Sequence, residues 1–460
     1  MVTFQHDVSG TAESVWSSAL AERDLPALDL QALPGSAGSR PLRRLVVVAA
    51  HPDDETLGAA GLVAHAHAAG LEVQVVVATR GEASHPHSPT HTPQMLAQRR
   101  LAEVASAVAV VAPGQHLDVL CLPDGRLAEH EAALTARVVA LVGDGRDCLV
   151  VGPWRGDGHP DHEAAGRCAA AAAARTDARL LEYPVWFWHW GTADDAPWGS
   201  ALRLELGPEG RELKERAVQA HHSQVAPLSG RPGDEVLLGD DVLAHHRRDC
   251  EVFWQLEAED TALERLHVDE VDPWGVDERW YEQRKRELVL SCLPRQRFRR
   301  AVEVGCSTGA LAAALAERCD DLLALDQSTT AVGRARQRLA DAGLDHARAE
   351  RASLPEEWPV VAGCDLVVIS EVGYFLGAAR LEQLLARVAT SLDADGVVVL
   401  CHWRHEVEGW PLDGPSVHRA ARSSRLLPPV AATYADRDVE LLVLCGADQL
   451  PDPRPEPHDG

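Results

Sequence analysis

The sequence predicts an α/β protein with two Rossmann-like α/β domains, each a mainly parallel sheet flanked by helices. Strand-like apolar runs alternate with alanine-rich, helix-like segments over residues 42–186 and again from about residue 270. The strand-like runs are almost unbroken valine and leucine, as expected when helices cover both faces of a sheet. The length of 460 residues also exceeds what one ordinary hydrophobic core accommodates.

The composition restricts the class of partner. The chain has 44 basic and 70 acidic residues, a formal charge of −26, which argues against nucleic acid and against an anionic membrane surface. No apolar run approaches the roughly 18 residues of a membrane span, and the start MVTFQHDVSG lacks the basic and apolar parts of a signal peptide. We therefore expect a cytoplasmic protein with a small-molecule substrate.

The first alternating region is predicted to contain strands and helices in strict succession. The strands are expected at 42–50, 71–79, 116–123, 148–153 and 179–186, and the helices near 55–69, 94–112, 128–142 and 162–175. Residues 211–257, which contain ERAVQAHHSQ and DDVLAHHRRDCEVFWQLE, are predicted to be helical.

A second alternating region follows a short polar passage that begins at Glu257. Its strands are expected at 300–306, 321–328, 364–372 and 396–403, with a later run at 440–446 that would close the sheet. The tail PDPRPEPHDG is rich in proline and charge, which favours disorder. The resulting division is a first domain at 1–257, a linker at 258–270, a second domain at 271–449 and a tail at 450–460.

Two loops of the first domain carry histidines and carboxylates to one place. In an open α/β sheet the ligand crevice lies beyond the carboxyl ends of the strands. AHPDDE at 50–55 follows the first expected strand, and DGHPDH at 157–162 follows the fourth. Histidines and carboxylates without a thiolate suit a catalytic zinc ion that keeps one open position. A bound cation would also offset the repulsion among three consecutive acids.

The alternative for either motif is an ordinary turn. A single His-Pro or Asp-Asp in a loop is more often a capped turn than a metal site, because Asp and Pro favour turns for local reasons. Two matched tetrads at the ends of two strands favour the metal site instead. On its own, Asp157 remains open to interpretation as a turn residue.

At this point the sequence resembles a family, the PIG-L or LmbE-like zinc-dependent N-deacetylases, which remove acetyl groups from N-acetylglucosaminyl compounds. The resemblance covers about residues 43–257. Its motifs are AHPDDE (50–55), GHPDH (158–162), TRGEAS (79–84), R-x-x-E at Arg100 and Glu103, LPDG (122–125) and K-x-x-A-x-x-x-H-x-S-Q from Lys214 to Gln224.

The resemblance implies roles for several residues of the two histidine motifs. His51, Asp54 and His162 would be the zinc ligands. Asp53 would be the general base, and His159 would stabilise the oxyanion or protonate the leaving amine. Asp161 would orient a histidine from outside the ligand set. This assignment agrees with the chemistry of amide hydrolysis, in which zinc acidifies water and polarises the carbonyl while a nearby carboxylate takes a proton.

The stretch EYPVWFWHW at 182–190 is unusually aromatic. In a strand, Trp186, Trp188 and Trp190 would share one face and could form a substrate wall, since indole stacks on the C–H side of a sugar or on an acyl chain. Packing in the core is an equally good interpretation.

The second domain has a glycine-rich turn after its first expected strand, in VEVGCSTGAL. Gly305 and Gly309 would let the backbone approach a ligand, and Asp326 at the end of the next strand would hold a ribose. The alternative is an ordinary α/β turn followed by an exposed acid. A dinucleotide fingerprint requires G-x-G-x-x-G, but Ser307 stands where its middle glycine should be.

The turn instead resembles the first motif of class I S-adenosylmethionine methyltransferases. WYEQRKRELVLSCLP (280–294), LPEEWP (354–359), DLVVISEVGYFL and CHWRHEVEGWPLDG (401–414) further resemble the nodulation-protein-S-like members, and coverage is about 270–446. By this resemblance the cofactor-binding residues would be Glu303, Gly305, Ser307, Gly309 and Asp326. Residues expected on the substrate side are Tyr281, Glu371, His402 and His405.

The sequence thus predicts a bifunctional enzyme, a zinc-dependent N-deacetylase of an amino-sugar conjugate joined to an S-adenosylmethionine-dependent methyltransferase. The amine uncovered by the first domain would be a natural acceptor for the second. Alternatives are O-methylation of a separate molecule, a second domain that only senses S-adenosylmethionine, and a scaffold in which both sites are degenerate.

Overall fold

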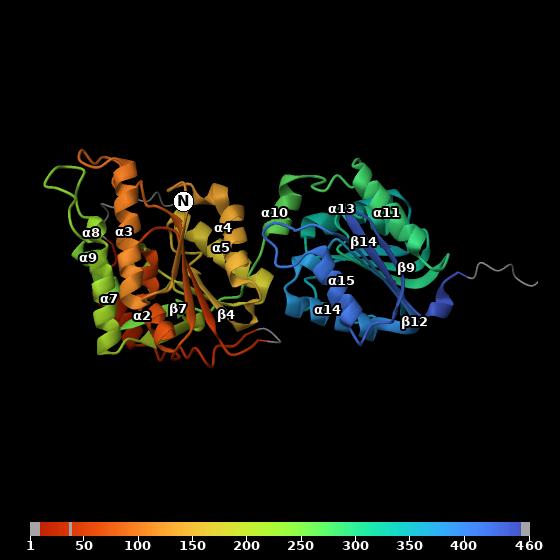
Figure 1. The fold of residues 1–460 in the computed structure, drawn as a ribbon, viewed down its shortest axis with the longest axis horizontal. Helices are drawn as coiled ribbons and strands as arrows, with labels where there is room; N and C mark the ends of the chain where they lie inside the picture. The colour runs from red at the N-terminus through yellow and green to blue at the C-terminus, as the bar shows by residue number, and fades with distance from the viewer. Residues whose placement is uncertain (1–9, 36–38, 452–460) are drawn as a thin grey trace, which may run out of the picture. The chain divides into compact units, whose positions relative to one another are not determined.

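The protein consists of two compact units, which divide between Asp260 and Thr261. They are seen in a computed structural model that describes residues 10–35 and 39–451 (Figure 1). The predicted tail at 450–460 lies almost entirely outside the described residues. None of the helices within these ranges is both long and apolar enough to cross a membrane.

The first unit contains a seven-stranded sheet in the order β3-β2-β1-β4-β5-β7-β6. Strands β1 to β5 pair in parallel, whereas β7 pairs antiparallel with β5 and β6. This confirms the mainly parallel α/β prediction. The strands are β1 (Arg44–Ala49), β2 (Glu72–Thr79), β3 (His116–Leu122), β4 (Cys148–Pro153), β5 (Arg179–Tyr183), β6 (Ala201–Glu205) and β7 (Cys250–Trp254).

Helices cover both faces of this sheet, and successive side chains of β1 point into cores on opposite faces. Val47 packs in the core under α2, α3 and α7, while Val46 and Val48 pack in a second core under α4 and α5. The helices are α1 (Glu13–Ala21), α2 (Asp54–Ala68), α3 (Pro93–Val111), α4 (Glu131–Val142), α5 (Pro160–Thr176), α6 (Phe187–Trp190), α7 (Pro208–Ala220), α8 (His222–Val225) and α9 (Asp240–His246).

The prediction of a helical region at 211–257 is wrong at its end. Residues Cys250–Trp254 form the fully buried strand β7, which pairs with β6 over residues Ala201–Glu205. The stretch Cys-Glu-Val-Phe-Trp is short and rich in residues that favour strands, and its pairing partner lies about fifty residues earlier. The prediction therefore extended the helical pattern of the preceding residues past the point where the helix ends.

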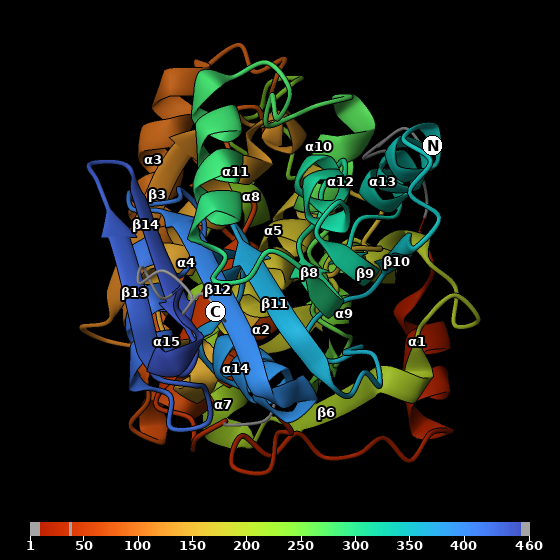
Figure 2. The ribbon, with the colours of Figure 1, turned by 90° about the vertical axis from the view of Figure 1, so that its right-hand side faces the viewer.

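The second unit repeats this architecture with strand order β10-β9-β8-β11-β12-β14-β13. Figure 2 shows β11, β12, β14 and β13 side by side, and the β12–β14 and β14–β13 pairs are antiparallel. The strands are β8 (Phe298–Val304), β9 (Cys319–Asp326), β10 (Ala347–Arg351), β11 (Cys364–Ser370), β12 (Leu392–Trp403), β13 (Val430–Ala435) and β14 (Val439–Leu444).

Its helices again divide between two cores. Ala301 of β8 packs with residues of α11, α12 and α13, whereas Val302 packs with residues of α14 and α15. The helices are α10 (Ala262–Asp269), α11 (Trp280–Cys292), α12 (Ala310–Ala316), α13 (Thr329–Asp341), α14 (Ala378–Ser391) and α15 (Gly414–Ser423).

The structure departs from the prediction of a linker at 258–270. Helix α10 occupies most of that stretch and packs on α13, and Thr330 Oγ1 donates a 2.7 Å hydrogen bond to Glu264. Its high polarity suggested a linker, but His267 of this helix is buried within the second unit.

A buried ion pair ties α7 to β7 in the first unit. Lys214 Nζ lies 2.8 Å from Glu251 Oε1, and only 5% and 3% of the two residues is exposed. Glu251 also accepts hydrogen bonds from the backbone N–H groups of Gly61 and Leu62, both at 2.8 Å. Lys214, which the sequence motif singled out, thus supports α2, whose first turn carries Asp54.

Replacing Lys214 by methionine should therefore destabilise the first unit. The change leaves a buried carboxylate without its counter-charge, so we expect the free energy of unfolding to fall by about 3–5 kcal/mol. Urea unfolding followed by tryptophan fluorescence measures this. Arg216→Met, at an exposed position of the same helix, should change stability by less than about 0.5 kcal/mol. Equal losses in both variants would contradict the account.

Candidate functional site

Three predicted ligands meet at the carboxyl ends of β1 and β4. His51 follows β1, Asp54 begins α2, and His162 lies in the first turn of α5. His162 Nε2 is 3.2 Å from His51 Nδ1 and 3.1 Å from Asp54 Oδ1, and His51 Nδ1 is 3.6 Å from Asp54 Oδ2. Donors that surround a tetrahedral zinc at 2.0–2.2 Å are separated by roughly 3.3 Å. The three side chains therefore fit one such ion.

Carboxylates hold the far nitrogen of each histidine. His162 Nδ1 lies 2.8 Å from Asp157 Oδ2, and His51 Nε2 lies 3.2 Å from Asp161 Oδ2 and 3.1 Å from Asp124 Oδ1. A ring that donates its N–H to a carboxylate on one side keeps its other nitrogen as an acceptor or ligand. The nitrogens that remain for an ion are His51 Nδ1 and His162 Nε2, which face each other. Asp161 lies where its predicted orienting role requires.

The sequence left Asp157 open as a turn residue and gave Asp124 no role of its own. Asp157 is 1% exposed and accepts hydrogen bonds from the backbone N–H groups of Val185 and Phe187, at 2.7 and 3.0 Å, as well as from His162. It is therefore more than a turn residue. Asp124 belongs to the LPDG motif after β3, and its place beyond the carboxyl end of a strand was the available signal.

Asp53 is held by a buried arginine beside this site. Its Oδ1 lies 3.0 Å from Arg100 Nη2, and Arg100 also donates to the carbonyls of Pro52 and Gly81. A Cβ atom at Gly81 would lie 2.1 Å from Arg100 Nη1, so glycine is needed there. Burial raises the pKa of Asp53 to about 6, although Arg100 opposes the rise. Asp53 can thus take up and release a proton near neutrality.

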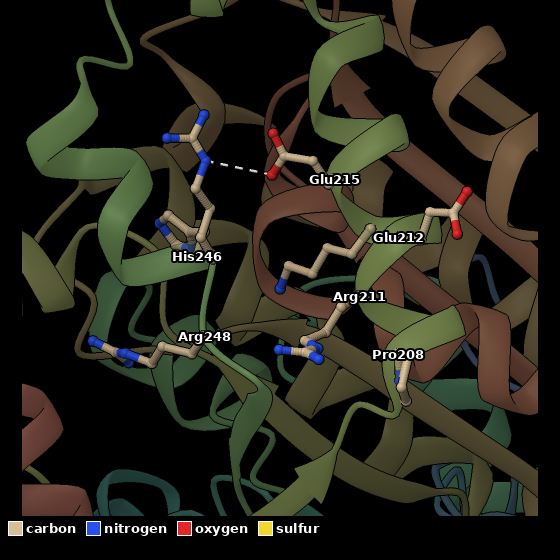
Figure 3. A pocket seen from close by; sticks show the side chains of 8 residues that line it. Pro208, Arg211, Glu212, Glu215, His246 and Arg248 are labelled. Atoms are coloured by element: carbon tan, nitrogen blue, oxygen red, sulfur yellow. Dashed lines mark hydrogen bonds and ion pairs between the residues drawn. The ribbon is translucent and has the colours of Figure 1, made fainter.

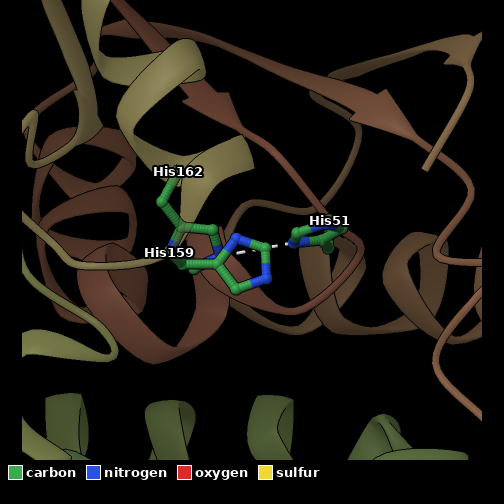
Figure 4. Close-up of side chains that lie close together, drawn as sticks. All are labelled: His51, His159 and His162. Carbon is green, nitrogen blue, oxygen red and sulfur yellow. Dashed lines mark hydrogen bonds between the residues drawn. The ribbon is translucent and has the colours of Figure 1, made fainter. Parts of the chain in front are cut away.

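His159 lies against both histidines, with ring centroids 5.0 Å from His51 and 4.5 Å from His162 (Figure 4). Burial holds the pKa of His159 well below its usual value, so its ring is neutral. Its Nδ1 accepts a 3.2 Å hydrogen bond from the backbone N–H of Asp161. The neutral ring therefore carries its proton on Nε2 and can donate it.

The surrounding acids make this site favourable for positive charge. Burial disfavours a charged imidazole, yet Asp54 and Asp157 raise the pKa of His162 to about 9. Hydrogen bonds to Asp124 and Asp161 likewise raise the pKa of His51 against the effect of burial. A metal ion would therefore compete with protons for these histidine nitrogens.

The aromatic stretch does not form the predicted strand. Pro184 lacks the N–H that would continue β5, and Phe187–Trp190 form helix α6. Trp186 and Trp190, four residues apart, stack at 5.3 Å with an interplanar angle of 16°. Trp188 faces the opposite way, is 3% exposed and packs on Trp16 in the core, so its predicted place in a substrate wall is wrong. A Cβ atom at Gly158 would lie 3.1 Å from the Trp190 ring, so this pair adjoins the His159 loop.

A surface hollow of about 450 Å³ in the first unit contains none of the predicted site residues (Figure 3). Three of its cations are paired, Arg247 with Glu215, Arg248 with Glu13 and Lys214 with Glu251. The lining residues are Pro208, Arg211, Glu212, Lys214, Glu215, His246, Arg247 and Arg248.

In the second unit, the glycine turn after β8 has the conformation that close backbone approach requires. Gly305 and Gly309 have φ angles of 79° and 81°, in the left-handed region. A Cβ atom at Gly305 would lie 1.8 Å from Val372 Cγ2, so no side chain fits there. The backbone N–H of Ser307 donates a 2.9 Å hydrogen bond to Asp326 Oδ2, which joins the turn to the end of β9.

Buried polar atoms around this turn lack hydrogen-bond partners among the described residues. They are Glu303 Oε2, Ser307 Oγ, Thr308 Oγ1 and, from helix α10, His267 Nδ1. Burial raises the pKa of Glu303 to about 8. Buried groups in native proteins are normally satisfied, so a polar ligand at this turn fits the observation. His267, 3% exposed, is a further residue that the sequence did not suggest, because α10 was taken for a linker.

The predicted substrate-side residues divide into two sets. Tyr281 Oη lies 3.4 Å from Glu371 Oε1, so these two meet at the carboxyl end of β11. His402 is fully buried between His418, at 3.0 Å, and the backbone N–H of Gly373, at 3.1 Å, so it supports the loop and does not face a ligand. His405 is exposed and pairs with Asp438.

Comparison with known families supports the description of both units. Residues 46–173 match the family described as GlcNAc-PI de-N-acetylase (PIG-L), and residues 256–411 match the family described as Nodulation protein S (NodS). The first unit therefore carries a PIG-L deacetylase domain and the second a NodS-like methyltransferase domain, both of them enzyme families. The predicted resemblances are confirmed.

Individual relatives cover only part of the chain. A 1D-myo-inositol 2-acetamido-2-deoxy-alpha-D-glucopyranoside deacetylase from Rhodococcus opacus is 32% identical over 28% of this chain and 53% of that protein. Nodulation protein S from Sinorhizobium fredii is 32% identical over 28% of this chain and 59% of that protein. The solved N-methyltransferase NodS from Bradyrhizobium japonicum WM9, in complex with S-adenosyl-L-homocysteine, is 22% identical with a TM-score of 0.36, and the match covers 40% of this chain and 96% of that one. The chain spans about half the length of the curated deacetylases that it matches.

Proposed function

We propose that the chain is a bifunctional enzyme of small molecules. Its first unit removes the acetyl group of an N-acetylated amino-sugar conjugate with the help of a divalent metal, and its second unit transfers a methyl group from S-adenosylmethionine. The observation that carries the first activity is the set of facing nitrogens of His51 and His162 with Asp54 between them. The deacetylase names of the relatives support the substrate class.

His51, Asp54 and His162 would hold the metal, because two imidazoles and a carboxylate form a donor set that zinc prefers. When bound, zinc supplies a Lewis acid that polarises the amide carbonyl and lowers the pKa of water. Asp157, Asp124 and Asp161 would orient the two histidines from outside.

Two side chains then move the protons of amide hydrolysis. Asp53 takes the proton from the attacking water and passes it to the nitrogen of the leaving amine. His159, neutral and protonated on Nε2, donates a hydrogen bond to the oxygen that becomes negatively charged when water adds. The products are acetate and a free primary amine. Trp186 and Trp190 offer an indole surface beside the His159 loop for the apolar face of a sugar ring.

Asp53→Asn should abolish most hydrolysis without removing the metal. Loss of the general base should lower kcat for N-acetylglucosaminyl inositol by about 100-fold or more, measured as acetate released. In the wild type, the rate should fall as pH drops below about 6 and Asp53 gains a proton, and a bound cation would move that fall to lower pH.

The control is Asp194→Asn, the same chemical change at an exposed position, which should leave kcat within about twofold of the wild type. An Asp53→Asn variant with full activity would refute the assignment of the base. The absence of acetate release from every N-acetyl amino sugar tested would refute the deacetylase proposal.

The second activity rests on the turn at Gly305 and on Asp326. S-adenosylmethionine, when bound, supplies an activated methyl group. The turn lets the backbone approach the cofactor, and Asp326 accepts hydrogen bonds from the ribose hydroxyls. The unpartnered atoms of Ser307 and Thr308 offer further hydrogen bonds. A domain that only senses this cofactor would bind it with no transfer.

Asp326→Ala should weaken binding of S-adenosylhomocysteine to the full chain by about 1–3 kcal/mol, because a hydrogen bond to a charged group is lost. Isothermal titration calorimetry measures this affinity. Asp345→Ala, at an exposed position after α13, serves as the control and should bind normally. Tight binding of NAD with no response to S-adenosylhomocysteine would contradict the cofactor assignment.

We further propose that the two reactions act in order on one molecule. An amide nitrogen is a poor nucleophile, whereas the primary amine left by deacetylation carries a free lone pair. Joining both units in one chain would raise the local concentration of that amine near the second site.

The order can be tested with Asp54→Ala protein. Given the N-acetyl substrate and S-adenosylmethionine, this variant should form no methylated product, and supplying the free amine should restore methylation to the wild-type rate. Mass spectrometry separates loss of acetyl from gain of methyl. Equal methylation of the acetylated compound, or a methyl group on oxygen, would contradict the ordered scheme and leave both enzyme classes standing.

A further inference from the structure

Helix α10 carries a buried histidine whose hydrogen-bonding capacity the protein itself does not use. His267 is 3% exposed, and its Nδ1 atom has no hydrogen-bond partner in the part of the chain that the structure describes. Buried polar atoms in native proteins are normally satisfied by protein, by water or by a ligand. Neither of the two proposed reactions gives this ring a role, so its partner belongs to something that the site binds.

A hydrogen bond fastens α10 to the start of α13. Thr330 Oγ1, in the first turn of α13, donates to Glu264 Oε1 at 2.7 Å. Glu264 and His267 are three residues apart, so they lie on the same side of α10. Strand β9 ends at Asp326, three residues before α13 begins at Thr329. The side of α10 that carries His267 therefore faces the loop that follows Asp326.

The charge of Asp326 acts on the His267 ring. Burial lowers the pKa of His267, and the negative charge of Asp326 opposes that change. An electrostatic effect of this kind falls with distance, so the carboxylate lies near the ring. Because the pKa of His267 is lowered overall, the ring is neutral at neutral pH. A neutral imidazole has one N–H donor and one lone pair.

The carboxylate of Asp326 can accept more hydrogen bonds than the protein supplies. Oδ1 accepts one from the backbone N–H of Ser328 and Oδ2 one from the backbone N–H of Ser307, both at 2.9 Å. A carboxylate offers about four acceptor positions, so each oxygen can also accept a ribose hydroxyl. The hydroxyl oxygens would then keep lone pairs of their own. Asp326 only accepts, so a separate donor must satisfy them.

We propose that His267 is a specificity-determining residue for the ribose of the cofactor. The N–H of His267 Nδ1 donates to one ribose hydroxyl, and that hydroxyl donates its own hydrogen to Asp326. This inference rests on the proposed binding of S-adenosylmethionine. A sugar without this hydroxyl leaves two buried polar groups unpaired, so the site discriminates against a deoxyribose. Helix α10, the first helix after the division between the two units, thus forms part of the cofactor site.

The test measures the affinity of the full chain for S-adenosylhomocysteine and for its 2′-deoxy and 3′-deoxy analogues by isothermal titration calorimetry. His267→Phe keeps a ring of similar size but removes the donor, so S-adenosylhomocysteine should bind about three- to tenfold more weakly. One analogue lacks the hydroxyl that His267 contacts, and its affinity should differ by less than about twofold between this variant and the wild type. The other analogue should lose as much affinity as S-adenosylhomocysteine does.

Two further variants test the position of the donor. His267→Asn places an amide N–H close to the position of Nδ1 and should keep the wild-type affinity within about twofold. His267→Gln extends its amide past that position, toward the place of Nε2, and should lose as much affinity as His267→Phe. The matched control is Val268→Phe, which puts the same ring at a 60% exposed position of the same helix and should bind normally.

Two outcomes would overturn the inference and leave the cofactor assignment standing. Wild-type affinity for S-adenosylhomocysteine in His267→Phe would remove the role of His267. Equal weakening toward S-adenosylhomocysteine and both deoxy analogues would make His267 a residue that packs α10 and not one that recognises ribose. A wild-type chain that binds neither S-adenosylmethionine nor S-adenosylhomocysteine would refute the proposed cofactor, and the inference with it.

Discussion

The first unit depends on the burial of several carboxylates in one place. Asp53, Asp54, Asp124, Asp157 and Asp161 all lie within a few residues of the carboxyl ends of β1, β3 and β4, and each is largely buried. Like charges at this density would destabilise the fold without compensation. Arg100 offsets one of them permanently, whereas His51 and His162 offset the others only when they carry protons or share a cation. The divalent ion proposed for this site would offset the same repulsion, which would allow these acids to be adjacent in sequence.

Both units obtain their sites from the same property of a parallel sheet. Parallel strands end at one edge, so residues that follow different strands meet there although they are far apart in sequence. In the first unit this brings together His51 and His162, 111 residues apart. In the second it brings the Gly305 turn, Asp326 and Glu371 to a common edge. The chemistry differs because the loops differ. The loops of the first unit carry acids and imidazoles, whereas the turn of the second unit carries glycines and unpartnered hydroxyls.

The sequence allowed the central strands and the two histidine motifs to be predicted because both are local signals. Valine-rich runs mark β1, β4, β8 and β11 directly. The edge strands β6, β10 and β13, and β7 beside β6, were missed or misassigned, since they are short and their pairing partners lie elsewhere in the chain. Trp188 was misplaced because Pro184 ends β5 and changes a period of two into a helical turn. The role of Asp157 stayed open and His267 was not suggested, because local sequence does not show what folding places beside them: His162 beside Asp157, and the cofactor turn beside His267.

The metal content of the full chain tests the central claim, that His51, Asp54 and His162 together form one cation site. Purified protein, loaded with zinc and dialysed, should retain about one ion per chain by mass spectrometry of the metal, and Asp54→Ala should retain almost none. Asp53→Asn should keep its ion, since its side chain pairs with Arg100. Retention of the ion by Asp54→Ala together with its loss from Asp53→Asn would contradict the account.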